Sequence, residues 1–453
     1  MSFDFERLQK EWTGLADAVL VRASELKLDA AMAFSAQDDL SVKVRLGKLE
    51  EIRQSAPVGF SIRVYKGKRS VSSSTSHMEK ARLLALVDRL ASTVDLVDED
   101  DATGMPEKEL LYAGGPDLDL YDPKVTDLTA ELAREMAIRG EAAAMAADKR
   151  IKNSSGADVG LARGGVMRFN TQGLAAFRPG SAVTLSVSPV AEDDAGNKYS
   201  DGWFCSARHL GDLDDAEAVG KIAARRCLDQ IGADNQVGTG RYPVLFAPET
   251  SMGLLTHLFE CISGDRIYKG SSFLAGKEGQ AVASELVTVI DDPLRLRGLS
   301  SAPFDNEGVA TSTRTLVDRG ILKLYPCDTF AARKLKRKST GHSAGGGAIR
   351  SYNLHVANGT ETREALLSKV GTGLLVNSFI GFSFNHATGD FSRGVRGFWI
   401  ENGKVGKPIQ EVTVSGNLGT MLQDVVAVGN DLELRYGTDS PSLLIREMVV
   451  SGS

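Results

Sequence analysis

The chain has 453 residues, of which 42% are hydrophobic and 25% charged, and its formal net charge is −6. This balance is ordinary for a globular protein with room for two or three domains, and it excludes nucleic-acid binding through a broad basic surface. No apolar run reaches the roughly 18 residues of a transmembrane helix. Four cysteines without a CxxC pair, and residues 1–7 without a leader pattern, favour a cytoplasmic protein.

Hydrophobic periodicity in the first half predicts a mixture of helices and strands. A capping box of Ser76 and Glu79 is expected to open the second helix. The glycine-rich stretch 231–241 predicts the end of a first, mixed helix and sheet domain at residues 1–235. The expected elements are helices at about 4–26, 76–94, 124–149 and 214–232, and strands at 40–46, 59–65 and between 158 and 187.

The second half, residues 236–453, is richer in glycine and in short alternating runs, which predicts a strand-rich domain. The fold class expected is therefore α+β, in two domains. The basic run at 333–338 is short and is interpreted as a solvated helix face. The expected elements are a strand at 242–247, helices near 250–263, 326–338, 360–368 and 421–422, and a strand at 397–402.

Several segments of this chain resemble the TldD/PmbA (TldD/TldE) family. The segment Ser392-Arg393-Gly394, followed by Gly397-Phe398-Trp399, is similar to the PmbA/TldE branch in particular. The resemblance implies the two-domain α+β fold of that family. The other resembling segments are 39–42, 74–76, 117–121, 153–157, 303–308, 389–394, 416–418 and 428–432.

Zinc-bearing members of the family carry His-Glu-x-x-x-His on the helix that follows the 242–247 strand. Those motif positions fall here at Leu255, Thr256 and Glu260. The family's third ligand, a cysteine near the C-terminus, has no counterpart in Leu434–Ser442. Leucine cannot bind zinc, and threonine cannot act as the carboxylate that activates a metal-bound water. We therefore expect no catalytic residues, no metal and no other cofactor at these positions of the chain.

The resemblance implies a metal-free, non-catalytic subunit of a TldD/TldE-type metallopeptidase. Its expected partners are a zinc-bearing TldD-type subunit and an extended, unfolded or short peptide substrate, around which the two subunits would form a chamber. Some relatives carry the label modulator of DNA gyrase, but the charge leads us to expect no direct binding of nucleic acid, and no membrane association is expected. A homodimer is expected when the partner is absent, with the apolar strand Gly397–Asn402 as a candidate contact.

The sequence leaves two alternative functions open. The first is an active metallopeptidase with a divergent site, because His257, Glu260 and Cys261 stand at helical spacings i, i+3 and i+4. His257 and Cys261 could then hold a metal together with an unseen third ligand. The structural alternative is that Cys261 is a small buried apolar residue and that His257 is a hydrogen-bonded residue at the border of the core. The second alternative is a stand-alone peptide-binding or assembly protein.

Two further patterns are interpreted structurally rather than catalytically. Gly341-His342-Ser343-Ala344-Gly345 matches G-x-S-x-G, but it lacks the preceding apolar strand and the following helix of a nucleophile elbow. Asp305 and Glu307 are paired carboxylates, yet their Pro, Asn and Gly neighbours favour a turn.

Overall fold

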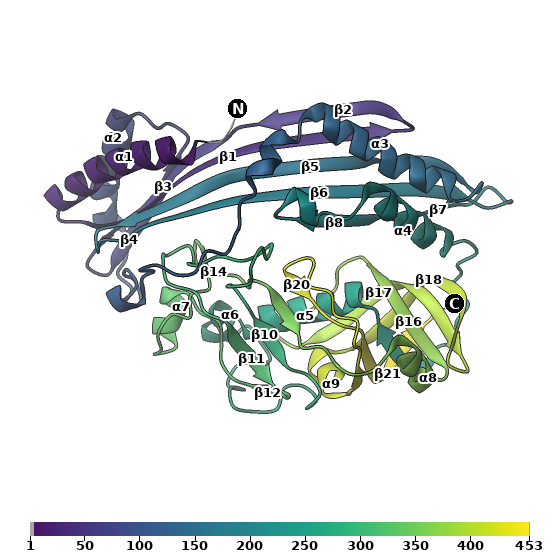
Figure 1. Ribbon diagram of the computed structural model, residues 1–453. Coiled ribbons are helices and arrows are strands. Elements are labelled where there is room, and N and C mark those ends of the chain that lie inside the picture. Colours follow the sequence, from purple (N-terminus) through teal and green to yellow (C-terminus); the bar gives the residue numbers. More distant parts are fainter. Residues whose placement is uncertain (1–3, 453) are drawn as a thin grey trace.

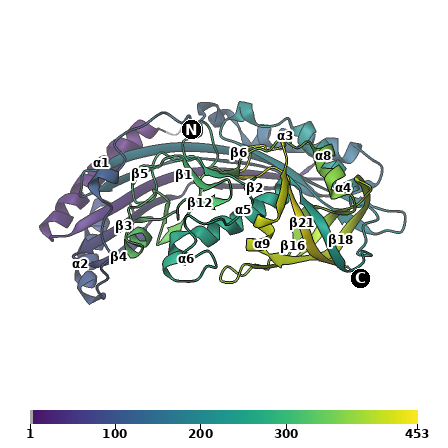
Figure 2. The ribbon, with the colours of Figure 1, turned by 90° about the horizontal axis from the view of Figure 1, so that it is seen from below.

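The computed structural model describes residues 4–452 and shows a mixed α+β protein (Figure 1). Met1–Phe3, on which the expectation about a leader partly rests, lie outside the described residues. A long, arched N-terminal sheet lies over a strand-rich C-terminal unit, as the α+β prediction requires. Seen from below, the C-terminal unit extends along the sheet (Figure 2). Within residues 4–452 no helix combines the length and the apolar character needed to cross a bilayer.

The N-terminal sheet has the strand order β4-β3-β1-β5-β6-β7, with β2 beside β1 and β8 beside β6. All its neighbouring strands run antiparallel. The strands are β1 (Asp29–Arg45), β2 (Lys48–Ser55), β3 (Val58–Lys66), β4 (Arg69–Thr75), β5 (Ile151–Asn170), β6 (Ala175–Glu192), β7 (Lys198–Ser200) and β8 (Trp203–Ala207).

Two helix pairs cover one face of this sheet and bury two separate cores. Met32 and Phe34 of β1 lie in one core with Trp12, while Val42 and Val44 of the same strand lie in the other. Buried and less buried residues alternate along β1, as a strand with one covered face requires. The helical segments are α1 (Phe5–Glu25), α2 (Lys80–Thr93), α3 (Ala130–Ala146), α4 (Ala216–Leu228) and the 3₁₀ turns η1 (Val94–Leu96), η2 (Lys108–Leu110), η3 (Pro123–Asp127) and η4 (Leu210–Asp212).

Helices α3 and α4 approach closely because two glycines face each other. A Cβ atom at Gly220 would lie 2.1 Å from the carbonyl oxygen of Gly140. We expect Gly220→Ala to lower the free energy of unfolding by about 2 kcal/mol, because the two helix backbones must separate. Gly14, inside α1, has open space at its Cβ position. Gly14→Ala is the matched control and should stabilise the chain by up to about 1 kcal/mol in urea denaturation; equal effects of both variants would contradict the prediction.

The C-terminal unit is built on a small closed barrel, β18-β17-β16-β9-β21, which closes through pairing of β18 with β21. A second sheet has the order β12-β11-β10-β15-β20. The strands of the whole C-terminal unit are β9 (Gly240–Phe246), β10 (Val289–Asp291), β11 (Arg314–Asp318), β12 (Ile321–Leu322), β13 (Ser343–Gly345), β14 (Ala348–Ile349), β15 (Leu354–Val356), β16 (Gly373–Ile380), β17 (Asp390–Glu401), β18 (Lys404–Asn417), β19 (Val425–Val428), β20 (Thr438–Asp439) and β21 (Leu443–Ser451). Its helices are α5 (Pro248–Ile262), α6 (Gly264–Tyr268), α7 (Thr329–Lys334), α8 (Arg363–Val370) and α9 (Leu418–Gln423).

Several expected boundaries were wrong. The first strand begins at Asp29 rather than residue 40, because alternating small residues such as Ala30 also bury one face. Helix α2 begins at Lys80, with Glu79 in the cap position and no side-chain cap bond, so the Ser76 capping box does not form. The helix expected at 124–149 is divided at Thr129, whose hydroxyl caps α3. Strand β2 was missed because its side chains are mostly exposed and carry no hydrophobic alternation.

The apolar strand Gly397–Asn402 is used inside the C-terminal unit. Phe398 and Ile400 pack in one hydrophobic cluster and Trp399 against another, on opposite faces of β17. The Trp399 ring meets Tyr242 edge-on, with centroids 5.0 Å apart. Packing on both faces accounts for these side chains without a subunit contact, and the expected homodimer stays a prediction.

Candidate functional site

Helix α5 carries the positions at which the family motif was expected. It follows β9 directly, with Pro248 in its first turn, where the missing N–H costs no hydrogen bond. One side of the helix is buried in the main C-terminal core through Leu254, Leu258 and Ile262. The other side carries His257 and Glu260, which remain partly accessible. The helix therefore presents a polar edge from a fixed apolar base.

The three motif positions do not meet at a common point. Leu255 is 2% exposed and belongs to the hydrophobic core. Thr256 is exposed, and its hydroxyl donates to the Met252 carbonyl oxygen of the same helix at 2.9 Å. Glu260 instead faces two histidines. The three side chains therefore lie in different surroundings and do not converge on one metal site of the His-Glu-x-x-x-His type.

His257, Glu260 and His386 form a cluster at this edge of α5. Glu260 Oε2 lies 3.3 Å from His257 Nδ1 and 2.8 Å from His386 Nε2. Hydrogen bonding from His257, and then from His386, lowers the pKa of Glu260 to about 2. A metal ion needs several ligand atoms close together. Within residues 4–452, this is the group of His, Cys, Asp and Glu side chains in which three potential ligand atoms all lie within 4.8 Å of one another.

Aromatic contacts and backbone bonds hold the histidines in place. Phe384 stacks on His257, with ring centroids 4.2 Å apart and planes at 20°, and meets His386 edge-on at 4.9 Å. The Phe273 N–H donates to the His386 carbonyl oxygen at 3.2 Å. The β16–β17 connection is thereby fastened to α5 and to the segment that follows α6.

Cys261 does not join this group, which departs from the divergent site considered above. Its side chain is fully buried, and burial raises the pKa of the thiol to about 12. A protonated, buried thiol is a poor metal ligand. Sequence reasoning missed His386 because it lies 126 residues beyond Glu260. Only the fold brings the two together, although the resemblance of the adjacent 389–394 segment could have drawn attention to it.

The C-terminal segment Leu434–Ser442 packs beside α5 without offering a thiol. Asp439 Oδ1 accepts from the backbone N–H groups of Arg435 and Tyr436 at 3.0 and 2.9 Å, and its side chain is buried. The role of this aspartate is therefore to fix the turn before β20.

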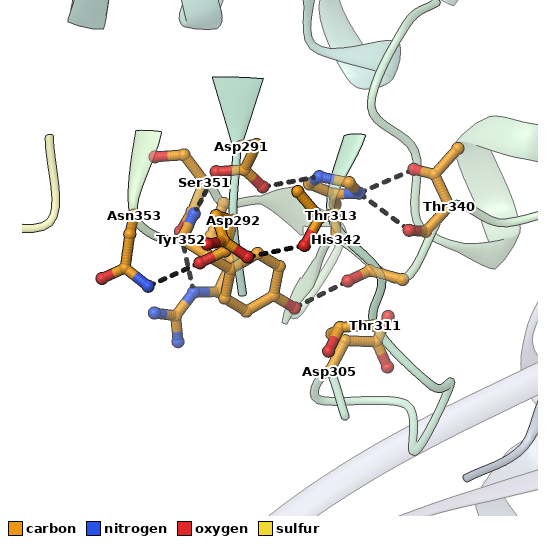
Figure 3. Close-up of polar contacts among 12 residues, drawn as sticks. Asp291, Asp292, Asp305, Thr311, Thr313, Thr340, His342, Ser351, Tyr352 and Asn353 are labelled. Carbon is orange, nitrogen blue, oxygen red and sulfur yellow. Dashed lines mark hydrogen bonds and ion pairs between the residues drawn. The ribbon is translucent and has the colours of Figure 1, made fainter. Parts of the chain in front are cut away.

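A second polar cluster is fully buried between β10 and the 339–353 segment (Figure 3). His342 Nε2 lies 3.0 Å from Asp291 Oδ2, and the two side chains are 1% and 0% exposed. The Tyr352 N–H donates to Asp291 Oδ1 at 2.8 Å. Ser343 lies on β13 and accepts from the Gly345 N–H. Since His342 is engaged with Asp291 and Thr340 and no helix follows Ser343, the G-x-S-x-G match is not a nucleophile elbow.

Asp305 and Glu307 form a turn, as the sequence indicated. Asp305 accepts from the N–H groups of Glu307, Val309 and Ser343 at 2.8–3.0 Å. Glu307 Oε2 accepts from the N–H and hydroxyl of Thr329. Burial raises the pKa of both carboxyls, to about 6 for Asp305 and about 7 for Glu307.

The sheet face opposite the two cores carries mainly small and polar side chains. A groove on it is lined by Asp39, Ser41, Gly160, Ala162 and Thr184, with a volume of about 760 Å³. A second cavity, of about 470 Å³, lies where the sheet meets the C-terminal unit and is lined by residues of both parts. There Arg168 donates to the carbonyl and side-chain oxygens of Asn306.

The basic run 333–338 is largely neutralised within the chain. Four of its cations lie beside carboxylates: Arg333 beside Glu107, Lys334 beside Asp100, Arg337 beside Glu278 and Lys338 beside Glu109. Paired cations of this kind are poorly placed to neutralise phosphates. The expectation that the chain does not bind nucleic acid stays a prediction.

Comparison with known proteins matches nearly the whole chain. Models of the PmbA/TldA metallopeptidase match residues 32–94 as domain 1, 123–231 as the central domain and 239–452 as the C-terminal domain. The chain is 34% identical over 423 residues to Metalloprotease PmbA of Escherichia coli O157:H7, covering 93% of this chain and 92% of that relative.

Solved structures show the same fold. A proposed modulator of DNA gyrase from Bacteroides thetaiotaomicron superposes with a TM-score of 0.90 at 28% identity, covering 100% of both chains. TldE from Thermococcus kodakarensis superposes with a TM-score of 0.85 at 22% identity, covering 97% of this chain and 100% of that one. The resemblance drawn from the sequence is confirmed: this chain belongs to the PmbA/TldD metallopeptidase family, in its PmbA branch.

Proposed function

We propose that this chain is a subunit of a TldD/TldE-type peptidase that lacks the family's zinc centre and helps to enclose the substrate. The observation that carries the proposal is the state of the motif positions on α5. Leu255 is buried in the core and Thr256 is bonded to its own helix, so neither can supply a zinc ligand or a catalytic carboxylate. The zinc, and the water that it activates, would then belong to a TldD-type partner.

The polar face of the arched sheet supports a role in binding extended peptide. Small side chains such as Ser41, Gly160 and Ala162 line the groove of about 760 Å³, which leaves room for an extended chain. The outer strand β4, rich in serine, borders the second cavity through Ser72–Ser74 and pairs on one side with β3. An edge strand of this kind can add a further strand from a bound peptide. The name of the E. coli relative, a metalloprotease, agrees with a peptide substrate.

The test is peptide cleavage by the purified chain alone and after mixing with a TldD-type relative that carries His-Glu-x-x-x-His. The isolated chain should show no chelator-sensitive cleavage, and the mixture should exceed the sum of its parts by about tenfold or more, because one subunit supplies the metal and the other completes the chamber. A relative with the motif Glu replaced by Gln is the control. Cleavage by this chain alone, or no co-elution with the relative, would reject the proposal.

A further inference from the structure

The cluster at the edge of α5 contains two imidazoles from outside the family motif, and a carboxylate at a motif position that the family fills with histidine. We propose that His257, Glu260 and His386 bind one divalent transition-metal ion of the zinc class. Of these residues only Glu260 occupies a position of the His-Glu-x-x-x-His motif, and the other two come from outside it. The inferred site therefore shares one position with the family's zinc motif and takes its other two ligands from elsewhere in this chain, and it does not rest on the function proposed above.

The distances suit a bound ion. Ligand atoms about 2.0–2.1 Å from a tetrahedral zinc ion lie about 3.3 Å from one another. Glu260 Oε2 lies 3.3 Å from His257 Nδ1 and 2.8 Å from His386 Nε2. All three potential ligand atoms fall within 4.8 Å of one another. Small shifts of the side chains would therefore bring the two nitrogens and the oxygen to a single ion.

The ligands are held in position before any ion binds. His257 and Glu260 lie one turn apart on α5, whose opposite side is anchored in the core. Phe384 contacts both imidazole rings, face-on at His257 and edge-on at His386. The His386 backbone is fixed by the Phe273 N–H, and the Asn385 N–H donates to the Asp390 carbonyl oxygen at 2.9 Å. Such support lowers the ordering cost of binding.

The donor set selects the class of ion. Two nitrogens and one carboxylate favour zinc, cobalt(II), nickel(II) or iron(II) over magnesium and calcium, which prefer oxygen ligands. The side chains of His257, Glu260 and His386 are 18%, 40% and 25% exposed, so water can complete the coordination. Three protein ligands with an open position describe an exchangeable site rather than a closed structural one.

The test uses the full chain, stripped with chelator and titrated with Zn²⁺ by calorimetry and with Co²⁺ by visible absorption. We expect one ion per chain, bound with a Kd of about 10 µM or tighter, and a cobalt spectrum of four- or five-coordinate character. His386→Ala and Glu260→Gln should each weaken binding about tenfold or more. His77→Ala is the control, because His77 is an exposed histidine beside a glutamate, Glu79, at 3.9 Å.

Circular dichroism of the variants separates ligand loss from misfolding, and Glu260→Gln keeps the shape of the side chain. Zinc binding weaker than about 1 mM, or equal affinity in the wild type, His386→Ala and Glu260→Gln, would overturn the inference. The two proposals fail separately. Chelator-sensitive cleavage by the zinc-loaded chain alone, lost in His386→Ala, would reject the non-catalytic role while supporting the metal site. Absence of zinc binding with an active mixed complex would do the reverse.

Discussion

Replacing Asp291 with alanine is expected to lower the free energy of unfolding by about 3–5 kcal/mol. Its two carboxylate oxygens are used by separate buried partners, the His342 ring and the Tyr352 N–H (Figure 3). The side chains of Asp291 and His342 are 0% and 1% exposed, so water cannot replace the lost acceptor. Alanine would leave a buried imidazole and a buried N–H without their partner, which is among the most destabilising changes known for single residues.

Asp318→Ala provides the matched control. Asp318 lies on the neighbouring strand β11 and pairs with Lys323 at 3.6 Å, but its side chain is 42% exposed. A surface ion pair contributes at most about 1 kcal/mol, so this variant should be close to the wild type. Urea denaturation followed by circular dichroism and tryptophan fluorescence measures both. Similar midpoints for Asp291→Ala and the wild type would show that the buried cluster does not stabilise the C-terminal unit.

Glu307→Gln is expected to remove a pH-dependent loss of stability of up to about 3 kcal/mol. Burial, together with the charges of Asp305 and Asp328, raises the pKa of Glu307 from 4.5 to about 7. Since the folded pKa lies above the unfolded value, the folded state holds the proton more tightly. The resulting stability is complete below about pH 4.5 and is lost as the pH rises through about 7.

The measurement is the free energy of unfolding between about pH 5 and pH 8, in the window that this shift defines. Wild type and Glu307→Gln should be similar at the lower pH, because glutamine resembles the protonated acid and can still accept from Thr329. The variant should be the more stable at the higher pH. Glu285→Gln, at an exposed position of the same unit, controls for the loss of one negative charge. Parallel curves for wild type and Glu307→Gln would contradict the prediction.

Local patterns predicted the α+β class and most helices, because each depends on neighbouring residues. The helix at 4–26 is α1 within one residue at each end, and α5 follows its apolar periodicity closely. Strand β2 was missed because long-range pairing rather than hydrophobic alternation defines it. The early half of β1 was missed because alanines stand on both of its faces, which obscures the alternation of buried Met32 and Phe34. Closure of the barrel through Thr413–Ser415 and Val449–Ser451 depends on contacts between distant segments, which periodicity cannot reveal.

The candidate site was predictable only in part, for a related reason. Spacing on a helix correctly placed His257 above Glu260. The same spacing suggested Cys261, yet a residue next to Glu260 points about 100° further round the helix, which here is into the core. His386 reaches the cluster from the β16–β17 connection, and no local pattern links that connection to α5.

The two cores of the N-terminal sheet have a consequence for how this part of the chain unfolds. Strands β1 and β5 run through both cores, and between them, on the covered face, stands the ion pair of Asp38 and Arg163, with Arg163 Nη2 2.6 Å from Asp38 Oδ2. Hydrophobic packing is therefore interrupted midway, while the backbone ladder continues. Each end can loosen without exposing the apolar residues of the other. The arched sheet then resembles two cooperative units that share one set of hydrogen bonds. It would open from its ends rather than all at once, and amide hydrogen exchange would detect this as faster exchange at the ends.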